Sequence, residues 1–475
     1  MKYYSTNRSC PEVSLSEAVI KGLAPDKGLY MPERIRPLPQ SFFDHIEDMS
    51  LQEIAFEVAK GFFGEDIPAD DLRQIVYDTL QFDIPLVKVN EQIYSLELYH
   101  GPTCAFKDVG ARFMARLLSY FAKGQNNTTA QQQNNQTTKQ PNNAAAQQQI
   151  HVLVATSGDT GSAVANGFLG VPGIDVTVLY PKGKVSLIQE KQFTTLGQNI
   201  TALEVDGVFD DCQRLVKEAF MDPELNQKFF LTSANSINVA RFLPQAFYYF
   251  YAYAQLKKQL KSSNGKLSNG QISPVVCVPS GNFGNICAGI FGMKMGLPIS
   301  RFIASNNAND IFFQYLQSGH YCPRATQATL ANAMDVGDPS NFARIVNLYG
   351  SGQQKAEKIT PEEAHAAITA EISGATYNDE QIKAAMRLAL SKDGYVCDPH
   401  GACGYQALTD GLKPGEVGIF LETAHPAKFK DTVEPIIGQE VPIPATLQKF
   451  MSGTKQSLPM TADFKDFKAF LMEKL

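Results

Sequence analysis

One lysine in this chain has the surroundings of a reactive amine. Lys107 follows Phe106 in the stretch "LYHGPTCAFKDVG", between a Gly-Pro turn and a helical pattern. Burial in an apolar setting disfavours the charged form of a lysine, so its pKa falls and the neutral amine becomes a nucleophile toward carbonyl groups. The alternative, from the residues alone, is a lysine that extends its charged end to solvent or pairs with Asp108.

A glycine-rich turn further along the chain is suited to bind a phosphate. The predicted strand "SPVVCVP" runs into "SGNFGN", Ser280 to Asn285, and a helix follows from about Ile286. Glycines let the main chain approach an anion closely, and a helix N-terminus adds unpaired N–H groups and the positive end of a dipole. The spacing of Gly281 and Gly284 matches neither the dinucleotide motif nor the P-loop motif. A tight structural turn without a ligand would explain the same residues.

A second turn of this kind is "ATSGDTG", where a strand ends near Ala155 and a helix begins near Thr160. Hydroxyls and main-chain donors from Ser157 to Gly161 suit a carboxylate or a phosphate at the helix N-terminus. The alternative is an ordinary helix cap formed by Asp159 or Thr160. One amine and two anion sites are what a pyridoxal phosphate enzyme requires to hold an aldehyde, a 5'-phosphate and a substrate carboxylate.

The elements around these turns predict an α/β fold with a mainly parallel sheet. Six apolar or β-branched runs are candidate strands: "IHVLVAT", "DVTVLY", "NITALEV", "SPVVCVPS", "RFIASN" and "EVGIFLET". Helical patterns follow several of them, as in "TGSAVANGFLG", "FDDCQRLVKEAFM" and "GNICAGIFGMKMG". Ligands of such folds bind at the carboxyl ends of the strands, where both turns lie. Residues 1–90 have a helical, turn-rich pattern and predict a separate N-terminal domain.

The composition restricts the class of protein. With 475 residues, 44% of them hydrophobic, the chain is long enough for two or three domains with large cores. The formal net charge of -6 argues against a nucleic-acid partner, and no apolar run is as long as a membrane span. We expect a cytoplasmic protein, without a signal peptide, that binds small molecules or copies of itself. The eight cysteines are scattered without metal-site spacing, so we expect reduced thiols and no metal.

Residues 124–149 interrupt the apolar pattern. This segment is nearly all Gln, Asn, Thr and Ala, and it has no apolar period. Such a composition cannot bury enough surface to offset the entropy of ordering, so we expect a disordered surface insertion. A prion-like assembly segment is the functional alternative.

Eight motifs, in order along the chain, resemble the threonine synthase family, whose members are pyridoxal phosphate enzymes of fold type II. They are "GLAPDKGLYMPE", "ELYHGPTCAFKD", "ATSGDTGSAVA", "SANSINVAR", "VPSGNFGN", "ATLANAMDVGDPSNF", "CDPHGA" and "LETAHPAKF". The resemblance covers almost the whole chain apart from the polar insertions. It implies two α/β lobes beside the N-terminal domain of residues 1–90: a larger cofactor-binding lobe of residues 91–123 and 230–475, and a smaller lobe of residues 150–229.

The same resemblance implies positions around pyridoxal 5'-phosphate. Lys107 corresponds to the lysine that bonds covalently to the aldehyde of the cofactor, and Thr423 corresponds to the hydroxyl that faces its pyridine nitrogen. Five residues are expected to hold the cofactor phosphate through their main chain: Gly281, Asn282, Phe283, Gly284 and Asn285. Asp159 would approach the 3'-oxygen of the cofactor, where many relatives have asparagine. A carboxylate there would repel a phenolate-like oxygen unless the two shared a proton.

Substrate contacts are implied in two further motifs. Ser157, Gly158 and Thr160 would receive the substrate carboxylate, and Asn235, Ser236 and Arg241 would receive its phosphate. A guanidinium can pair with two phosphate oxygens at once. From the local sequence alone, Arg241 fits a helix-surface arginine and Asn235 fits a helix cap, whereas the order of the motifs favours the phosphate receiver.

The reaction that the resemblance implies is the conversion of O-phospho-L-homoserine and water into L-threonine and phosphate, by a monomer or a homodimer. One alternative is another lyase of fold type II, such as a serine/threonine dehydratase or a cysteine synthase, which has no need of a receiver for a substrate phosphate. The other is a non-catalytic protein of the same fold that binds phosphorylated ligands, against which the presence of Lys107 and Thr423 argues.

Overall fold

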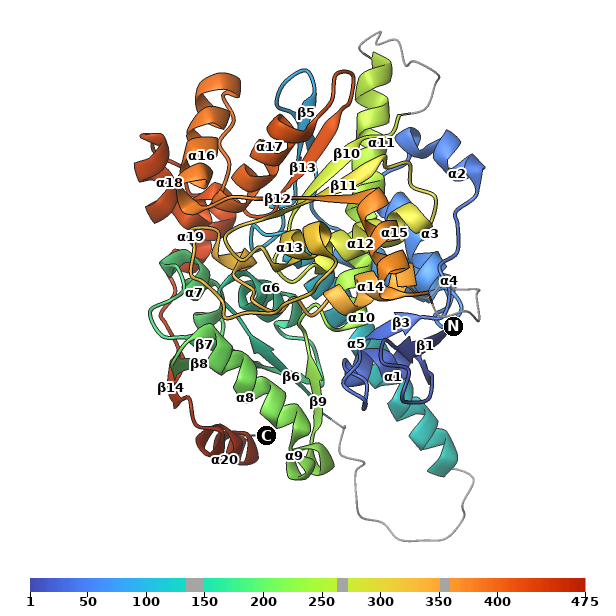
Figure 1. Cartoon of the computed structure of the whole chain (residues 1–475). Helices are drawn as coiled ribbons and strands as arrows, with labels where there is room; N and C mark the ends of the chain where they lie inside the picture. Colours follow the sequence, from blue (N-terminus) through green and yellow to red (C-terminus); the bar gives the residue numbers. More distant parts are fainter. Residues whose placement is uncertain (134–148, 263–271, 351–358, 475) are drawn as a thin grey trace.

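The structure, a computed structural model, describes residues 1–133, 149–262, 272–350 and 359–474. Within these ranges the strands form three sheets: a small one near the N-terminus and two larger ones of five and six strands. Figure 1 shows the two larger sheets one above the other, with helices around both. The predicted α/β fold with mainly parallel sheets is confirmed.

The N-terminal region combines short strands with helices. Its strands are β1 (Lys2–Ser5), β2 (Val13–Ser14) and β3 (Tyr30–Pro32), and its helices are α1 (Leu15–Lys21), α2 (Gln40–Asp44), the 3-10 helix η1 (Ile46–Asp48), α3 (Leu51–Phe63) and α4 (Ala69–Thr79). Helix α3 begins at a capping box of Ser50 and Glu53 and packs against α4. The sequence predicts the helices but not the antiparallel three-stranded sheet, because strands of two to four residues are too short to show alternation.

The larger sheet has the strand order β12-β11-β10-β13-β5-β4. Its strands are β4 (Leu86–Lys88), β5 (Ile93–Glu97), β10 (Val275–Pro279), β11 (Arg301–Asn306), β12 (Ile372–Thr376) and β13 (Gly418–Glu422). Every neighbouring pair is parallel except β4 and β5. All positions of β5, β10 and β13 are buried, as in a parallel sheet with both faces covered.

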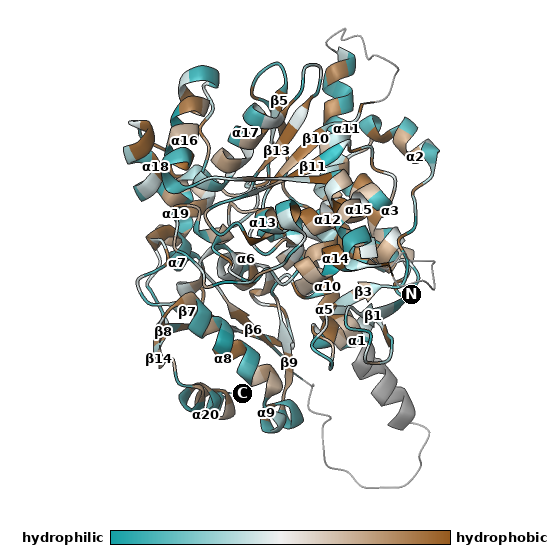
Figure 2. Cartoon of the chain, in the orientation of Figure 1, coloured by the Kyte–Doolittle hydropathy of each residue, from teal (hydrophilic) through white to brown (hydrophobic). Residues whose placement is uncertain are grey.

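The segments that the sequence assigns to the larger lobe form helices besides these strands. They are α5 (Lys107–Gln133), α10 (Val239–Phe242), η2 (Leu243–Gln245), α11 (Ala246–Ser262), α12 (Gly284–Lys294), α13 (Ile311–Ser318), η3 (Asn332–Met334), α14 (Phe342–Gly350), α15 (Pro361–Glu371), α16 (Asp379–Asp393), α17 (Pro399–Gly411), η4 (Pro426–Phe429), α18 (Lys430–Ile437) and α19 (Ala445–Met451). Figure 2 shows hydrophobic residues along β10 and β13, and mixed hydrophobic and hydrophilic residues on the outer helix α16. The core of this half therefore lies between the sheet and its helices.

The smaller sheet is entirely parallel, with the order β14-β8-β7-β6-β9. Its strands are β6 (Ile150–Ala155), β7 (Ile174–Pro181), β8 (Ile200–Asp206), β9 (Phe230–Ser233) and β14 (Ser457–Thr461), and its helices are α6 (Asp159–Phe168), α7 (Leu187–Thr194), α8 (Phe209–Met221), α9 (Pro223–Lys228) and α20 (Phe464–Lys474). The stretch "SGDTG" follows β6 and forms the start of α6, at the carboxyl end of the sheet, as predicted.

Two segments that the sequence assigns to the larger lobe are hydrogen-bonded to the smaller sheet. Strand β9 pairs with β6, and β14, close to the C-terminus, pairs with β8, while α20 packs on α8. Residues 230–233 and 457–474 are therefore corrected to the smaller lobe. Pairing between segments so far apart leaves no local signal in the sequence. The rest of the division into lobes stays a prediction.

Helix α5 extends into the polar segment for which the sequence predicts disorder. The helix begins at Lys107 and ends at Gln133, whereas the polar segment begins at residue 124. Adding a residue to an existing helix costs less than starting a new one, and Gln and Ala are good helix formers. The helix is therefore longer than predicted. The prediction for residues 134–148 lies outside the described residues.

Candidate active site

One cavity at the carboxyl ends of β6, β10 and β13 brings together most of the residues that the sequence singles out. Its walls include Lys107, Ser157, Thr160, Asn235, Ser236, Arg241, Gly281, Asn282, Phe283, Gly284, Asn285 and Thr423. Gly158 and Asp159 lie beside this cavity without forming part of its wall. The cavity therefore combines the lysine with both turns and with the proposed receiver of a substrate phosphate.

The turn before Lys107 is hydrogen-bonded to the segment that follows β13. The N–H of Phe106 donates to the carbonyl of Thr423 at 2.9 Å, and the N–H of His425 donates to the carbonyl of Cys104 at 3.1 Å. Cys104 has a φ of 54°, in the left-handed region, so the chain turns sharply before α5. Because Lys107 is the first residue of α5, these bonds fix its position relative to Thr423.

Lys107 is not paired with Asp108, so this alternative is wrong. The carboxylate of Asp108 accepts hydrogen bonds from the N–H and the hydroxyl of Thr103, at 2.9 and 2.6 Å. Burial lowers the pKa of Lys107 to about 8, although the nearby carboxylate of Asp159 opposes this shift. About a tenth of the amine is therefore uncharged at pH 7, and this fraction can act as a nucleophile.

The turn "SGNFGN" brings main-chain groups to the cavity at the N-terminus of α12. A Cβ atom on Gly281 would lie 2.7 Å from the Cα of Met334, and one on Gly284 would lie 2.8 Å from the Cβ of Ser236. Phe283 has a φ of 61° and immediately precedes α12. The chain can therefore follow this path only with glycine at both positions, and its first helical N–H groups face an anion site.

Asn285 adds a side-chain donor to this turn. Its Oδ1 accepts hydrogen bonds from the hydroxyls of Tyr248 and Tyr249, at 2.6 and 2.7 Å. Its Nδ2 is buried and has no hydrogen-bond partner within the described part of the chain. Because a buried donor without an acceptor is costly, this amide is arranged to bind an acceptor oxygen in the cavity. The sequence predicts Asn285 but gives no signal for the two tyrosines that orient it.

The turn "SGDTG" is organised by a residue that the sequence analysis does not single out. The hydroxyl of Thr156 accepts hydrogen bonds from the N–H groups of Gly158 and Gly161, at 2.9 and 2.7 Å. The N-cap residue of α6 is Gly158, and the hydroxyl of Thr156, in place of Asp159 or Thr160, bonds a first-turn N–H of this helix. Gly158 has a φ of 141°, and a Cβ there would lie 2.5 Å from the side chain of Gln189.

Asp159 points to a buried lysine from the other half of the molecule. The Nζ of Lys428 lies 2.6 Å from Oδ1 of Asp159, and Nε2 of Gln189 donates to the same oxygen at 2.8 Å. Burial alone would raise the pKa of Asp159, but the charges of Lys428 and Lys107 hold it well below its ordinary value. Lys428 lies within the motif "LETAHPAKF", yet its position there gives no indication of this partner.

Arg241 is buried and does not lie on a helix surface, so that alternative is wrong. Its Nε donates to the carbonyl of Ala234 at 2.8 Å, and its Nη1 donates to the carbonyl of Lys107 at 2.7 Å. Burial lowers the pKa of Arg241 to about 10, so the guanidinium stays charged at neutral pH. Asn238, not Asn235, caps α10, which leaves the side chain of Asn235 to line the cavity.

A histidine in the cavity wall was not predicted. His400 is buried, and its Nδ1 lies 2.8 Å from the carboxylate of Asp398, while its Nε2 accepts a hydrogen bond from the N–H of Ala333 at 3.1 Å. An Nε2 that accepts is unprotonated, so the ring donates through Nδ1 to Asp398. His400 therefore holds the segment 332–336, which lies against Gly281, in place. The motif "CDPHGA" contains both residues, and their spacing was the available signal.

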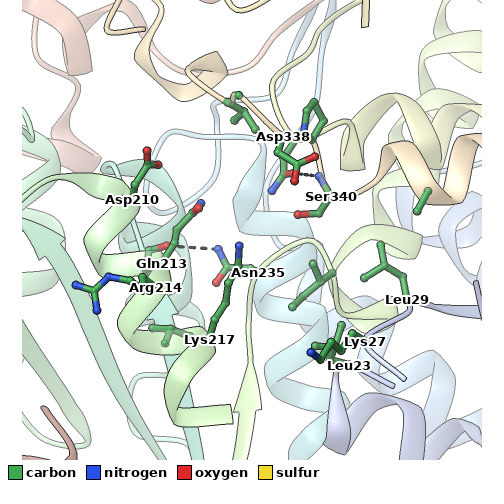
Figure 3. A pocket seen from close by; sticks show the side chains of 18 of the residues that line it. Leu23, Lys27, Leu29, Asp210, Gln213, Arg214, Lys217, Asn235, Asp338 and Ser340 are labelled. Atoms are coloured by element: carbon green, nitrogen blue, oxygen red, sulfur yellow. Dashed lines mark hydrogen bonds between the residues drawn. The ribbon is translucent and has the colours of Figure 1, made fainter. Parts of the chain in front are cut away.

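A larger cavity of about 860 Å³ adjoins this site. The two share Phe209, Gln213, Asn235, Asn282, Asp335 and Val336 in their walls. Figure 3 shows Asp210, Gln213, Arg214 and Lys217 on one side, Leu23, Lys27 and Leu29 of the N-terminal region on the other, and Asn235 between them. The N-terminal region thus forms part of the approach to the site.

Within the described residues no helix is long and apolar enough to cross a membrane. The same part of the chain contains no group of three or more His, Cys, Asp or Glu side chains placed to hold a metal ion.

The sequence matches family models whose descriptions agree with the chemistry of the cavity. Residues 79–421 match the model of the family described as pyridoxal-phosphate dependent enzyme, which defines the class of protein. Residues 2–80 match the family described as threonine synthase N terminus, and residues 401–471 match threonine synthase, C-terminal. The chain is 41% identical over 473 residues to threonine synthase of Haemophilus influenzae, with 100% of both chains covered. It is 40% identical over 475 residues to threonine synthase of Escherichia coli K12, with 99% of both covered.

Two solved structures agree with this assignment. The crystal structure of threonine synthase from Escherichia coli has a TM-score of 0.85 and 38% identity and covers 100% of both chains. The structure of threonine synthase with bound pyridoxal phosphate from Brucella melitensis has a TM-score of 0.85 and 34% identity, and covers 100% of this chain and 99% of the other. The chain belongs to the threonine synthase family. The predicted family, fold type and cofactor are confirmed.

The cavity fits pyridoxal 5'-phosphate. The glycine turn and the unpartnered Nδ2 of Asn285 would hold its phosphate, and the amine of Lys107 would bind its aldehyde. Thr423 would bring a hydroxyl to the pyridine nitrogen, since its carbonyl is already bonded to the turn before Lys107. Each of these three chemical groups of the cofactor thus has a counterpart of matching chemistry.

Proposed function

We propose that this protein converts O-phospho-L-homoserine and water into L-threonine and phosphate. The observation that supports the proposal most directly is a single cavity in which Lys107 lies with two separate groups of anion-binding residues. A cofactor phosphate requires one group, and a substrate that is itself a phosphate ester requires the other. Relatives along the whole length of the chain are threonine synthases. Pyridoxal phosphate, when bound, supplies an electron sink for charge that develops on the substrate carbons.

Lys107 moves the protons in this proposal. With its amine free, Lys107 would accept the proton of Cα and pass it to the substrate phosphate, and the amine could then accept a second proton from Cβ as phosphate leaves Cγ. Lys107 would return this second proton to Cγ. Water would then add at Cβ and give a proton to the amine, which Lys107 would return to Cα. A pKa of about 8 lets the same amine accept and donate protons near neutral pH.

Asn235, Ser236 and Arg241 would bind the substrate phosphate and stabilise it as it leaves. The hydroxyl of Ser236 accepts a hydrogen bond from Nδ2 of Asn341 at 3.0 Å, which turns its own proton toward other acceptors. The charge of Arg241 favours the departing dianion. Arg241 also holds the carbonyl of Lys107, so it would align the leaving group with the amine.

Ser157 and Thr160 would receive the substrate carboxylate at the N-terminus of α6. Gly158, predicted for the same role, shapes the turn instead, since its N–H is already bonded to Thr156. Of the three contacts predicted for the substrate carboxylate, the geometry favours Ser157 and Thr160.

The test is an assay of phosphate release from O-phospho-L-homoserine with L-threonine identified as the product. Ser236→Ala should raise KM by about tenfold, because a hydrogen bond to a charged group is lost, while the affinity for pyridoxal phosphate is unchanged. Ser318→Ala, on the exposed end of α13, is the control and should behave as wild type. An enzyme that releases ammonia from serine or threonine but no phosphate from O-phospho-L-homoserine would be one of the other fold type II lyases.

A further inference from the structure

A lysine with no solvent exposure lies beside the reacting amine. The side chain of Lys428 has a relative exposure of 0%, and that of its partner Asp159 has 4%. The ammonium of Lys428 lies 2.6 Å from Asp159 and donates to the carbonyl of Thr103 at 2.8 Å. A buried lysine of this kind is strongly disfavoured unless its charge is paired and its protons are bonded.

The contacts of Lys428 connect the two halves of the molecule. Lys428 is in η4, after β13 of the larger sheet, whereas Asp159 begins α6, after β6 of the smaller one. Ser186, directly before α7 of the smaller half, donates its hydroxyl proton to the carbonyl of Lys428 at 2.9 Å. Gln192 of α7 donates to the carbonyl of Thr103 at 3.0 Å. The ion pair is thus the centre of a hydrogen-bonded contact between the halves.

The same contact reaches the turn before Lys107. Thr103, whose carbonyl binds Lys428, donates both its N–H and its hydroxyl to Asp108, the residue after Lys107. The charges of Asp159 and Lys428 both act on Lys107, in opposite directions. The pair is therefore electrically neutral as a whole and close to the reacting amine.

We propose that Lys428 is a positioning residue of this reaction site, which keeps Asp159 in its charged form and ties it to the turn that holds Lys107. This inference rests on the proposed function and names a residue outside the cavity wall. From the sequence, the carboxylate of Asp159 is expected to repel the 3'-oxygen of the cofactor. The positive charge of Lys428 compensates that of Asp159, so this repulsion is reduced.

The consequence of removing the ammonium follows from electrostatics. In Lys428→Met the carboxylate of Asp159 keeps its burial but loses its main counter-charge, so its pKa rises. The pKa of Asp159 then moves toward the neutral range. The charged or titratable groups that act on the pair, and that both forms of the enzyme share, are Lys107 and Asp108 of α5, Cys104 of the preceding turn and His425 before η4, while Arg241 of α10 acts on Lys107.

The first measurement is kcat against pH for the holoenzyme. Lys428→Met should lower kcat at least about tenfold at its optimum and add an acid limb between about pH 5 and 8 that wild type lacks. Asp159→Asn/Lys428→Met should lose that limb, since no carboxylate remains to titrate. The control is Lys455→Met, which removes a lysine paired with Glu190 and Glu204 at 36% exposure and should leave the profile unchanged.

A second measurement does not depend on turnover. In the cofactor-free chain, a raised pKa of Asp159 means that the folded state of Lys428→Met binds a proton that the unfolded state releases. Its stability then falls as the pH rises. The deficit in Tm relative to wild type should grow from about pH 5 to pH 8, and the double variant should show a deficit independent of pH. This measurement tests the ion pair even if O-phospho-L-homoserine is not the substrate. Failure of the proposal about Lys428 can therefore be distinguished from failure of the proposed function.

Two results would overturn the inference. The first is a Lys428→Met enzyme whose kcat profile and Tm follow wild type at every pH. The second is an acid limb that persists in the double variant. Should Lys428→Met not fold, Asp159→Asn is compared with the double variant: loss of Lys428 should change kcat less than about threefold in this background, because its partner is already neutral. A larger loss there would show that Lys428 acts without Asp159 and would contradict the proposal.

Discussion

The first glycine of each turn that borders the cavity is required for a different reason. In "SGNFGN", Gly281 and Gly284 have ordinary φ angles and are required because neighbouring segments lie against them. In "SGDTG", Gly158 has a φ of 141° and is required by the path of its own backbone. The first turn presents main-chain N–H groups at a helix N-terminus, whereas the second presents side chains and stands beside a buried ion pair. We call the turn "SGNFGN" the cradle, and the turn "SGDTG" with its ion pair the side-chain cluster. The two are suited to different anions in one site.

The largest expected effect is at the amine that both turns face. Lys107→Ala removes the group that we propose to bind the cofactor and to move the protons, so turnover should fall at least about 10,000-fold. The Tm of the cofactor-free chain should stay close to that of wild type, because the amine of Lys107 has no hydrogen bond or ion pair within the part of the chain that the structure describes. Measurable turnover near the wild-type rate would exclude Lys107 as the proton carrier.

A pair of glycine substitutions tests the difference between the turns. Gly281→Ala places a Cβ 2.7 Å from the main chain of Met334, so it should displace the cradle and weaken pyridoxal phosphate binding by about tenfold to hundredfold. Gly158→Ala meets the flexible side chain of Gln189 but strains its own backbone, and it should chiefly lower Tm. The measurements are the Kd for the cofactor, by absorbance titration, and the Tm of each cofactor-free variant. If both variants raised the Kd for pyridoxal phosphate equally, the two glycines would not differ in their role in cofactor binding.

The cradle could be predicted from the sequence because its cause is local. The segment "SPVVCVPS" contains β10 (Val275–Pro279), and the helix expected from about Ile286 is α12 (Gly284–Lys294). A strand, a glycine turn and a helix N-terminus follow one another along the chain, so their chemistry can be inferred without knowing the rest of the fold.

The surroundings of Asp159 could not be predicted in this way. Its partner Lys428 comes from η4 of the other half, and no period or motif links two residues so distant in the sequence. The pairing of β14 with β8 of the smaller sheet could not be predicted for the same reason. Helix α5 ran beyond its expected end because helix growth depends on the preceding turns and not only on local composition. For Asp159 and β14, contacts between distant segments decided the outcome, whereas for α5 the preceding turns of the same helix decided it.

Asn285 offers a smaller and sharper test of the cradle. Asn285→Asp keeps an oxygen for the hydroxyls of Tyr248 and Tyr249 but replaces the unpartnered Nδ2 donor by a second oxygen. Repulsion of a phosphate should raise the Kd for pyridoxal phosphate by about tenfold, with KM for the substrate little changed. Asn341→Asp, whose amide binds Ser236 and the carbonyl of Asn282, is the comparison, and it should raise KM more than the Kd. Unchanged cofactor binding in Asn285→Asp would remove this side chain from the cradle.

The smallest expected effect is a shift in the pH dependence of cofactor binding, and it tests how the side-chain cluster acts on the amine. The rate at which the cofactor-free chain binds pyridoxal phosphate should rise with pH through about 8, because only the neutral amine of Lys107 attacks the aldehyde. The carboxylate of Asp159 opposes the lowering of this pKa, whereas the charges of Arg241 and Lys428 add to it. Asp159→Asn should therefore move the midpoint of the rate profile to lower pH and speed binding below the wild-type midpoint. Gly281→Ala, which leaves these charges in place, should slow binding at every pH without moving the midpoint. A midpoint that moves to higher pH in Asp159→Asn would mean that this carboxylate does not act on Lys107 as the geometry indicates.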